Sequence, residues 1–103
     1  MDKQKINEEQ IMRYFDEKLG KSIPSRLKKL KEEQNELDLA GFICLSSRDG
    51  KGKEEFLDEV SDVLAVITHL GHCLGYTHEQ LLNMAYDKCM IREKNPSYKH
   101  SNR

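Results

Sequence analysis

A helical repeat of apolar residues over residues 53–74 constrains the fold of this chain more than any other sequence feature. The apolar side chains recur at the i, i+3, i+4, i+7 spacing that places them on one helix face. They are Phe56, Val60, Val63, Leu64, Ile67, Leu70, Gly71 and Leu74. The pattern predicts a long amphipathic helix that ends at Gly75, because glycine commonly terminates helices.

Three further segments contain apolar residues compatible with a helix and have residues at their ends that cap or stop helices. We expect helices over about residues 7–19, 24–45 and 77–94. The expected N-caps are Asn7, Ser22 and Thr77, and Gln80 completes a capping box with Thr77. A glycine-containing segment, residues 46–52, should form the loop before the long helix. No segment predicts a strand, so we expect a single all-α domain over residues 1–103, a four-helix bundle with a mobile polar tail from about residue 97.

The composition indicates that such a bundle has a small core. Only 37% of the 103 residues are hydrophobic and 34% are charged. A domain of this size buries roughly 60–70% of the surface of its unfolded chain. We therefore expect oligomerisation to complete the core. The net charge of −1 argues against a partner that is a nucleic acid polymer or a membrane surface.

The sequence also favours a cytoplasmic location. No apolar run approaches the ~18 residues needed to span a bilayer, and residues 1–10 lack the apolar centre of a signal peptide. The three cysteines are an odd number without CxxC spacing, which indicates reduced thiols.

Two acidic pairs fall inside or beside the apolar stripes of the second and third helices. Glu33 and Glu36 share one helix face, as do Glu59 and Asp62. Because the two helices should pack antiparallel, these carboxylates are expected to converge and to need a compensating positive charge. An oxygen-only ligand set suits Mg²⁺, with Mn²⁺ as a second possibility, rather than zinc. Either pair alone is also compatible with an ordinary solvated helix face.

The spacing Glu33-x-x-Glu36, 22 intervening residues, and Glu59-x-x-Asp62 resembles the metal-binding signature of the MazG-like nucleotide pyrophosphohydrolases. The resemblance covers roughly residues 23–98. It implies an all-α protein, usually a homodimer or homotetramer, that uses Mg²⁺ to hydrolyse nucleoside triphosphates to monophosphate and pyrophosphate.

The resemblance also implies roles for individual residues. The four acids would hold the metal ions, and one of them could activate the attacking water. Lys88 corresponds to a phosphate-binding lysine of the family. Arg92 stands where the family has asparagine, while Asn95 follows three residues later, so the division of roles between them stays open. Tyr14 is the candidate for stacking on the base.

Three alternatives remain open. A non-catalytic helical oligomer could keep the fold without activity, and phosphoribosyl-ATP pyrophosphohydrolase belongs to the same superfamily. A zinc site could use His69, His72 and Cys73. We expect both histidines on the polar side of the long helix, which disfavours the zinc site.

Overall fold

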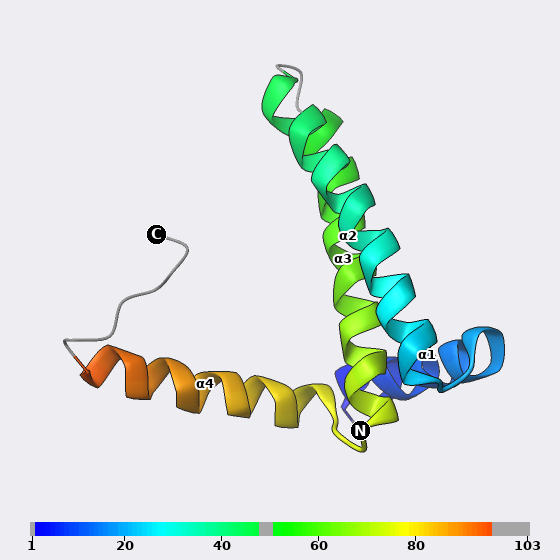
Figure 1. Cartoon of the computed structure of the whole chain (residues 1–103), viewed down its shortest axis with the longest axis vertical. Coiled ribbons are helices and arrows are strands. Elements are labelled where there is room, and N and C mark those ends of the chain that lie inside the picture. The colour runs from blue at the N-terminus through cyan, green and yellow to red at the C-terminus, as the bar shows by residue number, and fades with distance from the viewer. Residues whose placement is uncertain (1, 48–50, 96–103) are drawn as a thin grey trace.

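In the part of the chain that the structure describes, the polypeptide forms four α-helices (Figure 1). The computed structural model describes residues 2–47 and 51–95. The helices are α1 (Lys3–Leu19), α2 (Ile23–Ser46), α3 (Lys51–Cys73) and α4 (His78–Lys94). No strand occurs in these ranges, which confirms the predicted all-α class. The polar tail expected from about residue 97 lies outside the described residues.

Helices α2 and α3 lie side by side and antiparallel, as a long hairpin that forms the main body of the molecule (Figure 1). The loop predicted over residues 46–52 is shorter than expected, because α2 runs to Ser46 and α3 begins at Lys51. Gly52 is therefore helical and buried. A Cβ atom at Gly52 would lie 2.7 Å from the Cα atom of Cys44, so the missing side chain lets the two helices approach closely.

Local capping explains where α2 and α4 begin. The Ser22 hydroxyl accepts a hydrogen bond from the Ser25 amide at 3.5 Å, and Pro24 occupies the first turn of α2. At α4, the Thr77 hydroxyl accepts a hydrogen bond from the backbone amide of Gln80. In return, the side-chain oxygen of Gln80 accepts a hydrogen bond from the backbone amide of Thr77 at 2.8 Å. Both predicted N-caps are confirmed.

The predicted start of α1 is wrong by four residues. The helix begins at Lys3, and the carboxylate of Asp2, rather than the side chain of Asn7, accepts a hydrogen bond from the first turn, from the Gln4 amide at 3.0 Å. The first turn is polar and carries no apolar periodicity, so the capping aspartate is the only sequence signal for it.

A complete Schellman motif ends α3 and sets the direction of α4. Gly75 has a φ of 87°, its amide donates to the His72 carbonyl, and the Tyr76 amide donates to the Gly71 carbonyl at 2.9 Å. The predicted termination at Gly75 is therefore confirmed.

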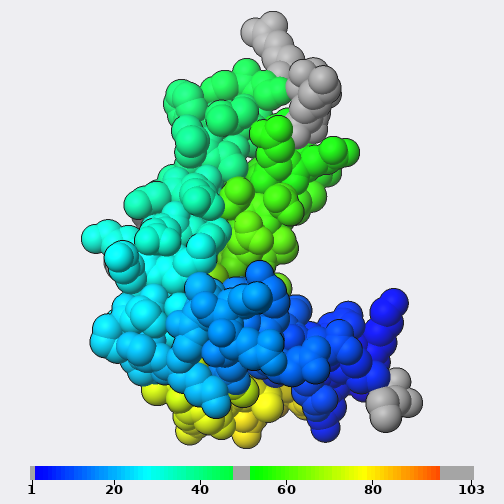
Figure 2. Space-filling view, turned by 90° about the vertical axis from the view of Figure 1, so that its right-hand side faces the viewer, coloured from blue at the N-terminus to red at the C-terminus, as the bar shows by residue number. Residues whose placement is uncertain are grey.

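Helix α1 packs across the lower end of the hairpin (Figure 2). Met12 of α1 and Val66 of α3 are the buried hydrophobic side chains of the described chain. Arg26 of α2, only 3% exposed, donates from Nη2 to the carbonyl of Leu19 at 3.3 Å, which satisfies the C-terminal end of α1.

Helix α4 extends away from the hairpin instead of packing along it (Figure 1). Its first turn is anchored, because the His78 amide donates to the Glu8 carboxylate of α1 at 3.2 Å. The radius of gyration is 16.4 Å, against the roughly 13 Å of a compact domain of about 100 residues. One chain therefore does not form a closed bundle by itself, and the expected completion of the bundle by oligomerisation stays a prediction.

Much of the predicted apolar stripe of α3 stays accessible in the single chain. Val60, Leu64 and Ile67 are 42–51% exposed, whereas Val66, which is outside the stripe, is buried. Large apolar side chains are also exposed on the other helices. Examples are Leu39, Phe42 and Leu45 on α2, and Leu82, Tyr86 and Ile91 on α4. Within the described ranges, no helix combines the length and apolar character needed to cross a membrane.

Candidate functional site

Three of the four predicted metal-ligating acids come together between the hairpin helices. Glu33 of α2 and Glu59 and Asp62 of α3 each place one carboxylate oxygen within 4.8 Å of the others. The antiparallel packing of α2 and α3 creates this acidic cluster, as their apolar periodicities predict.

The acidic cluster contains buried oxygens without partners. Glu33 is 6% exposed, and its Oε1 atom is paired with the Lys29 ammonium at 3.0 Å, one helical turn away. Its Oε2 atom and the Oε2 atom of Glu59 are buried and have no hydrogen-bond partner among the described residues. Leaving such atoms unpaired is costly, so the geometry calls for a positively charged or hydrogen-bonding group that the side chains do not supply.

The pKa shifts of the clustered acids also indicate that the cluster lacks a compensating positive charge. Burial raises the pKa of Glu59, and the negative charges of Glu36, Asp62 and Glu33 raise it further. Burial also raises the pKa of Asp62, with Glu33 adding to the effect and Lys29 opposing it. A single lysine therefore does not neutralise the cluster.

Glu36 lies at the edge of the cluster rather than inside it. Its side chain is exposed, one turn along α2 from Glu33. Together with Glu59 it lines a hollow of about 290 Å³ between residues 36–43 of α2 and residues 55–59 of α3. The structure thus gathers three of the predicted acids and leaves the fourth facing an open hollow beside them.

A groove connects the acidic cluster to the predicted base-stacking residue. It lies between α1 and α3, has a volume of about 520 Å³, and is lined by Asn7, Gln10, Ile11, Tyr14, Phe15, Ser61, Asp62 and Ala65. Tyr14 is 56% exposed, so its ring is accessible. The groove places amide, aromatic and carboxylate groups on one continuous surface.

The predicted phosphate-binding residues do not join this site within one chain. Lys88 and Arg92 belong to the second half of α4 and Asn95 caps its end, and this half-helix lies away from α2 and α3 (Figure 1).

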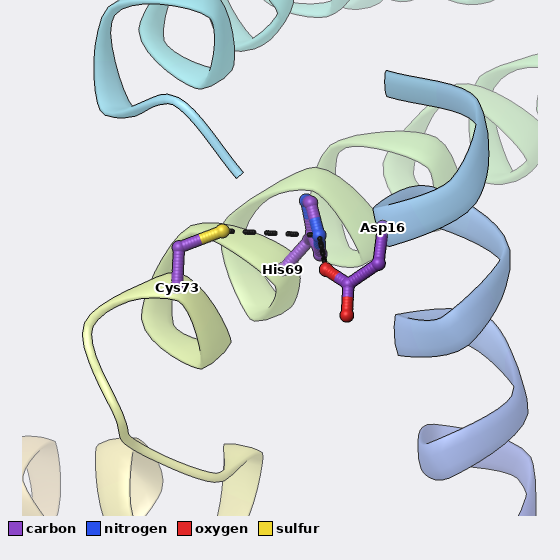
Figure 3. Close-up of side chains that lie close together, drawn as sticks. All are labelled: Asp16, His69 and Cys73. Atoms are coloured by element: carbon purple, nitrogen blue, oxygen red, sulfur yellow. Dashed lines mark hydrogen bonds and ion pairs between the residues drawn. The ribbon is translucent and has the colours of Figure 1, made fainter. Parts of the chain in front are cut away.

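A second cluster joins His69 and Cys73 of α3, two residues of the zinc site that the sequence disfavoured, to Asp16 of α1, which was not predicted (Figure 3). His69 is fully buried, which corrects the expectation that it lies on a polar face. The Nε2 atom of His69 lies 2.9 Å from Asp16 Oδ1 and 3.8 Å from Cys73 Sγ. Asp16 could have been suspected from sequence only by assuming that α1 crosses α3 at this point.

The side chains around Asp16 favour its ionised form. The hydrogen bond with His69 lowers the pKa of Asp16 despite the opposing effect of burial, and His72, whose Nε2 atom lies 3.1 Å from Oδ2, lowers it further. Burial raises the pKa of the Cys73 thiol, and the negative charge of Asp16 adds to this effect. Since a carboxylate only accepts hydrogen bonds, Nε2 of His69 carries the proton in this arrangement.

Comparisons of the chain with protein-family models, with curated proteins and with solved structures found no match.

Proposed function

We propose that this chain is a Mg²⁺-dependent pyrophosphohydrolase that cleaves nucleoside triphosphates to nucleoside monophosphate and pyrophosphate. The observation that carries the proposal is the convergence of Glu33, Glu59 and Asp62, with two buried carboxylate oxygens left unpartnered. The spacing of the acids, which resembles that of the MazG-like enzymes, supplies the reaction type.

The donor set fits a hard divalent cation. All three ligand groups are carboxylates, which favours Mg²⁺ or Mn²⁺ over softer metals. Glu33, Glu59 and Asp62 would hold the ion, and Glu36 could complete the set from its position beside Glu59. When bound, Mg²⁺ polarises phosphoryl oxygens and lowers the pKa of water.

The groove between α1 and α3 supports a nucleotide as the substrate. A triphosphate bound at the acidic cluster would leave its nucleoside beside Asp62, where the groove begins. Tyr14 can stack on a base there, while Asn7 and Gln10 offer amide donors and acceptors. In this proposal, the acidic cluster binds the triphosphate and the groove residues orient the nucleoside along α3.

We propose that the active form is at least a homodimer, with a homotetramer as the larger possibility. The exposed apolar side chains of α2, α3 and α4 are the observation that favours association. Lys88, Arg92 and Asn95 lie apart from the acids of their own chain, so we assign them to the phosphates of a site that association completes. Nucleotide hydrolysis and free cysteines also accord with a cytoplasmic location.

Release of pyrophosphate from a panel of NTPs, dNTPs and phosphoribosyl-ATP, measured with Mg²⁺, tests the proposal. Glu59→Gln should lower the rate at least about 100-fold, since it removes a metal-binding charge worth several kcal/mol in the transition state. Glu54→Gln, at an exposed position on the same helix, is the matched control and should retain the wild-type rate.

Other outcomes decide between the alternatives. Turnover of phosphoribosyl-ATP alone would assign the related activity. No turnover of any nucleotide, together with no Mg²⁺ binding by calorimetry, would replace the proposal with a non-catalytic helical oligomer.

A further inference from the structure

We propose that Asp16, His69 and Cys73 form a zinc site that fastens α1 to α3, separate from the acidic cluster. These residues are contributed by two helices and meet at the end of α3 opposite the hairpin loop (Figure 3). The proposal concerns a different group of residues from the proposed hydrolytic site and does not depend on it.

The geometry around His69 distinguishes a metal site from a catalytic triad. In a triad the nucleophile contacts one imidazole nitrogen and the acid contacts the other. Here Asp16 Oδ1 and Cys73 Sγ both approach the same nitrogen, Nε2, and no acid contacts Nδ1, which is buried without a partner among the described residues. Three donor atoms that converge on one point are the arrangement that surrounds a bound ion.

The distances are close to those of zinc ligands. Zinc bonds of 2.0–2.3 Å in a tetrahedron place neighbouring ligand atoms about 3.3–3.8 Å apart. The corresponding separations are 2.9 Å for the oxygen–nitrogen pair and 3.8 Å for the sulfur–nitrogen pair. Small side-chain movements would admit the ion in place of the Nε2 proton.

The donor chemistry selects the ion. A thiolate and an imidazole favour a borderline-soft metal such as Zn²⁺ over Mg²⁺. One carboxylate and one thiolate also balance a divalent charge, so the occupied site would be neutral. Binding would release the Cys73 thiol proton to solvent and would move the His69 proton from Nε2 to Nδ1, so that the imidazole stays neutral and no oxidation state changes.

The surroundings provide support and access. Phe15 packs on the His69 ring with centroids 5.2 Å apart and thereby fixes its position. His72 contacts the second oxygen of Asp16 and has a side chain that is 39% exposed. We assign His72 the role of orienting the Asp16 carboxylate, with the fourth position around zinc left to solvent on this side.

The test is to titrate the purified, chelator-treated full-length chain with Co²⁺ and with Zn²⁺. Co²⁺ reports on sulfur ligation, because a thiolate bound to it gives a charge-transfer absorption. We expect this absorption at one ion per chain, its displacement by Zn²⁺, and a higher unfolding temperature with Zn²⁺. The variants Cys44→Ser and Cys89→Ser should behave as the wild type, since both cysteines lie outside the cluster.

Ligand variants provide the decisive comparison. Cys73→Ser should lose the absorption, and Asp16→Asn should weaken zinc binding at least about tenfold while circular dichroism shows a folded helical protein. Glu59→Gln, in the acidic cluster, should leave the absorption unchanged. Absence of the absorption in the wild type, or its persistence in Cys73→Ser, would overturn the assignment.

Discussion

At the scale of single residues, the most informative feature is that Glu33 and Glu59 occupy positions in or beside the apolar stripes of their helices, where buried apolar side chains are normally found. The burial of Glu33 followed from its position within the stripe of α2, and the structure confirms it. The burial of His69 was missed because α3 was treated as having one apolar face. The side of α3 that carries His69 instead contacts Asp16 and Phe15 of α1, while α3 also packs along α2. Apolar periodicity alone does not distinguish two contact faces of one helix, because those faces depend on where the neighbouring helices lie.

The acidic cluster predicts an unusual pH dependence of stability in the absence of metal. The folded-state pKa values of Glu59 and Asp62 are raised above their ordinary values of 4.5 and 3.8. The folded state therefore holds these protons more tightly, and stability falls as the pH rises from about 4 through the raised pKa values. Asp16 has a lowered pKa, so its contribution changes only below about pH 4.

Urea unfolding of the chelated protein at several pH values measures this effect. The wild type should lose stability relative to the double variant Glu59→Gln, Asp62→Asn as the pH rises above about 4, and Mg²⁺ should stabilise only the wild type. Parallel pH profiles for the two proteins would show that neither burial nor the neighbouring negative charges raise the pKa values of these acids in the folded state.

At the scale of helices, local sequence signals account for most of the boundaries, with the starts of α1 and α3 as the exceptions. The Thr77–Gln80 capping box and the Gly75 terminator were predictable because they depend on neighbouring residues only. Gly52 was assigned to a loop because glycine breaks helical patterns in isolation. Its helical state depends on the close approach of α2, which is a tertiary contact and cannot be deduced from local sequence.

Gly52→Ala should separate the ends of the hairpin. Alanine would normally favour a helix by about 0.5–1 kcal/mol, but its Cβ would lie 2.7 Å from the Cys44 backbone. We expect a net destabilisation of about 1–3 kcal/mol from overpacking, measured by urea denaturation. Lys53→Ala, at an exposed neighbouring position, should be nearly neutral. A stabilised Gly52→Ala protein would contradict the close approach of the two helices.

At the scale of the whole molecule, the single chain has many exposed large apolar side chains and few buried ones among the described residues. The low apolar content of the sequence predicted a thin core, and the structure has few buried hydrophobic side chains in the described ranges. The direction of α4 was not predictable, because its apolar residues are not confined to one face and so indicate no particular packing partner. Oligomerisation stays a prediction.

Light scattering coupled to size-exclusion chromatography tests the assembly. The wild type should have at least twice the 12.0 kDa mass of one chain. The double variant Leu82→Glu, Tyr86→Glu should shift the mass toward one chain, because both side chains are more than 60% exposed and lie one turn apart on α4. The control Asn83→Glu, Lys94→Gln changes the charge equally at exposed polar positions. A wild-type protein with the mass of one chain would rule out the proposed assembly.

The turn between α3 and α4 has a further consequence for how copies of the chain would meet. Its geometry is fixed within one chain, by backbone hydrogen bonds of the turn, the positive φ of Gly75 and the hydrogen bond from the His78 amide to Glu8 of α1. If α4 has the same direction in the single chain as in the oligomer, it loses little conformational entropy when a second copy of the chain binds it. Association would then be a docking of preformed surfaces, with a rate governed by diffusional encounter and not by refolding.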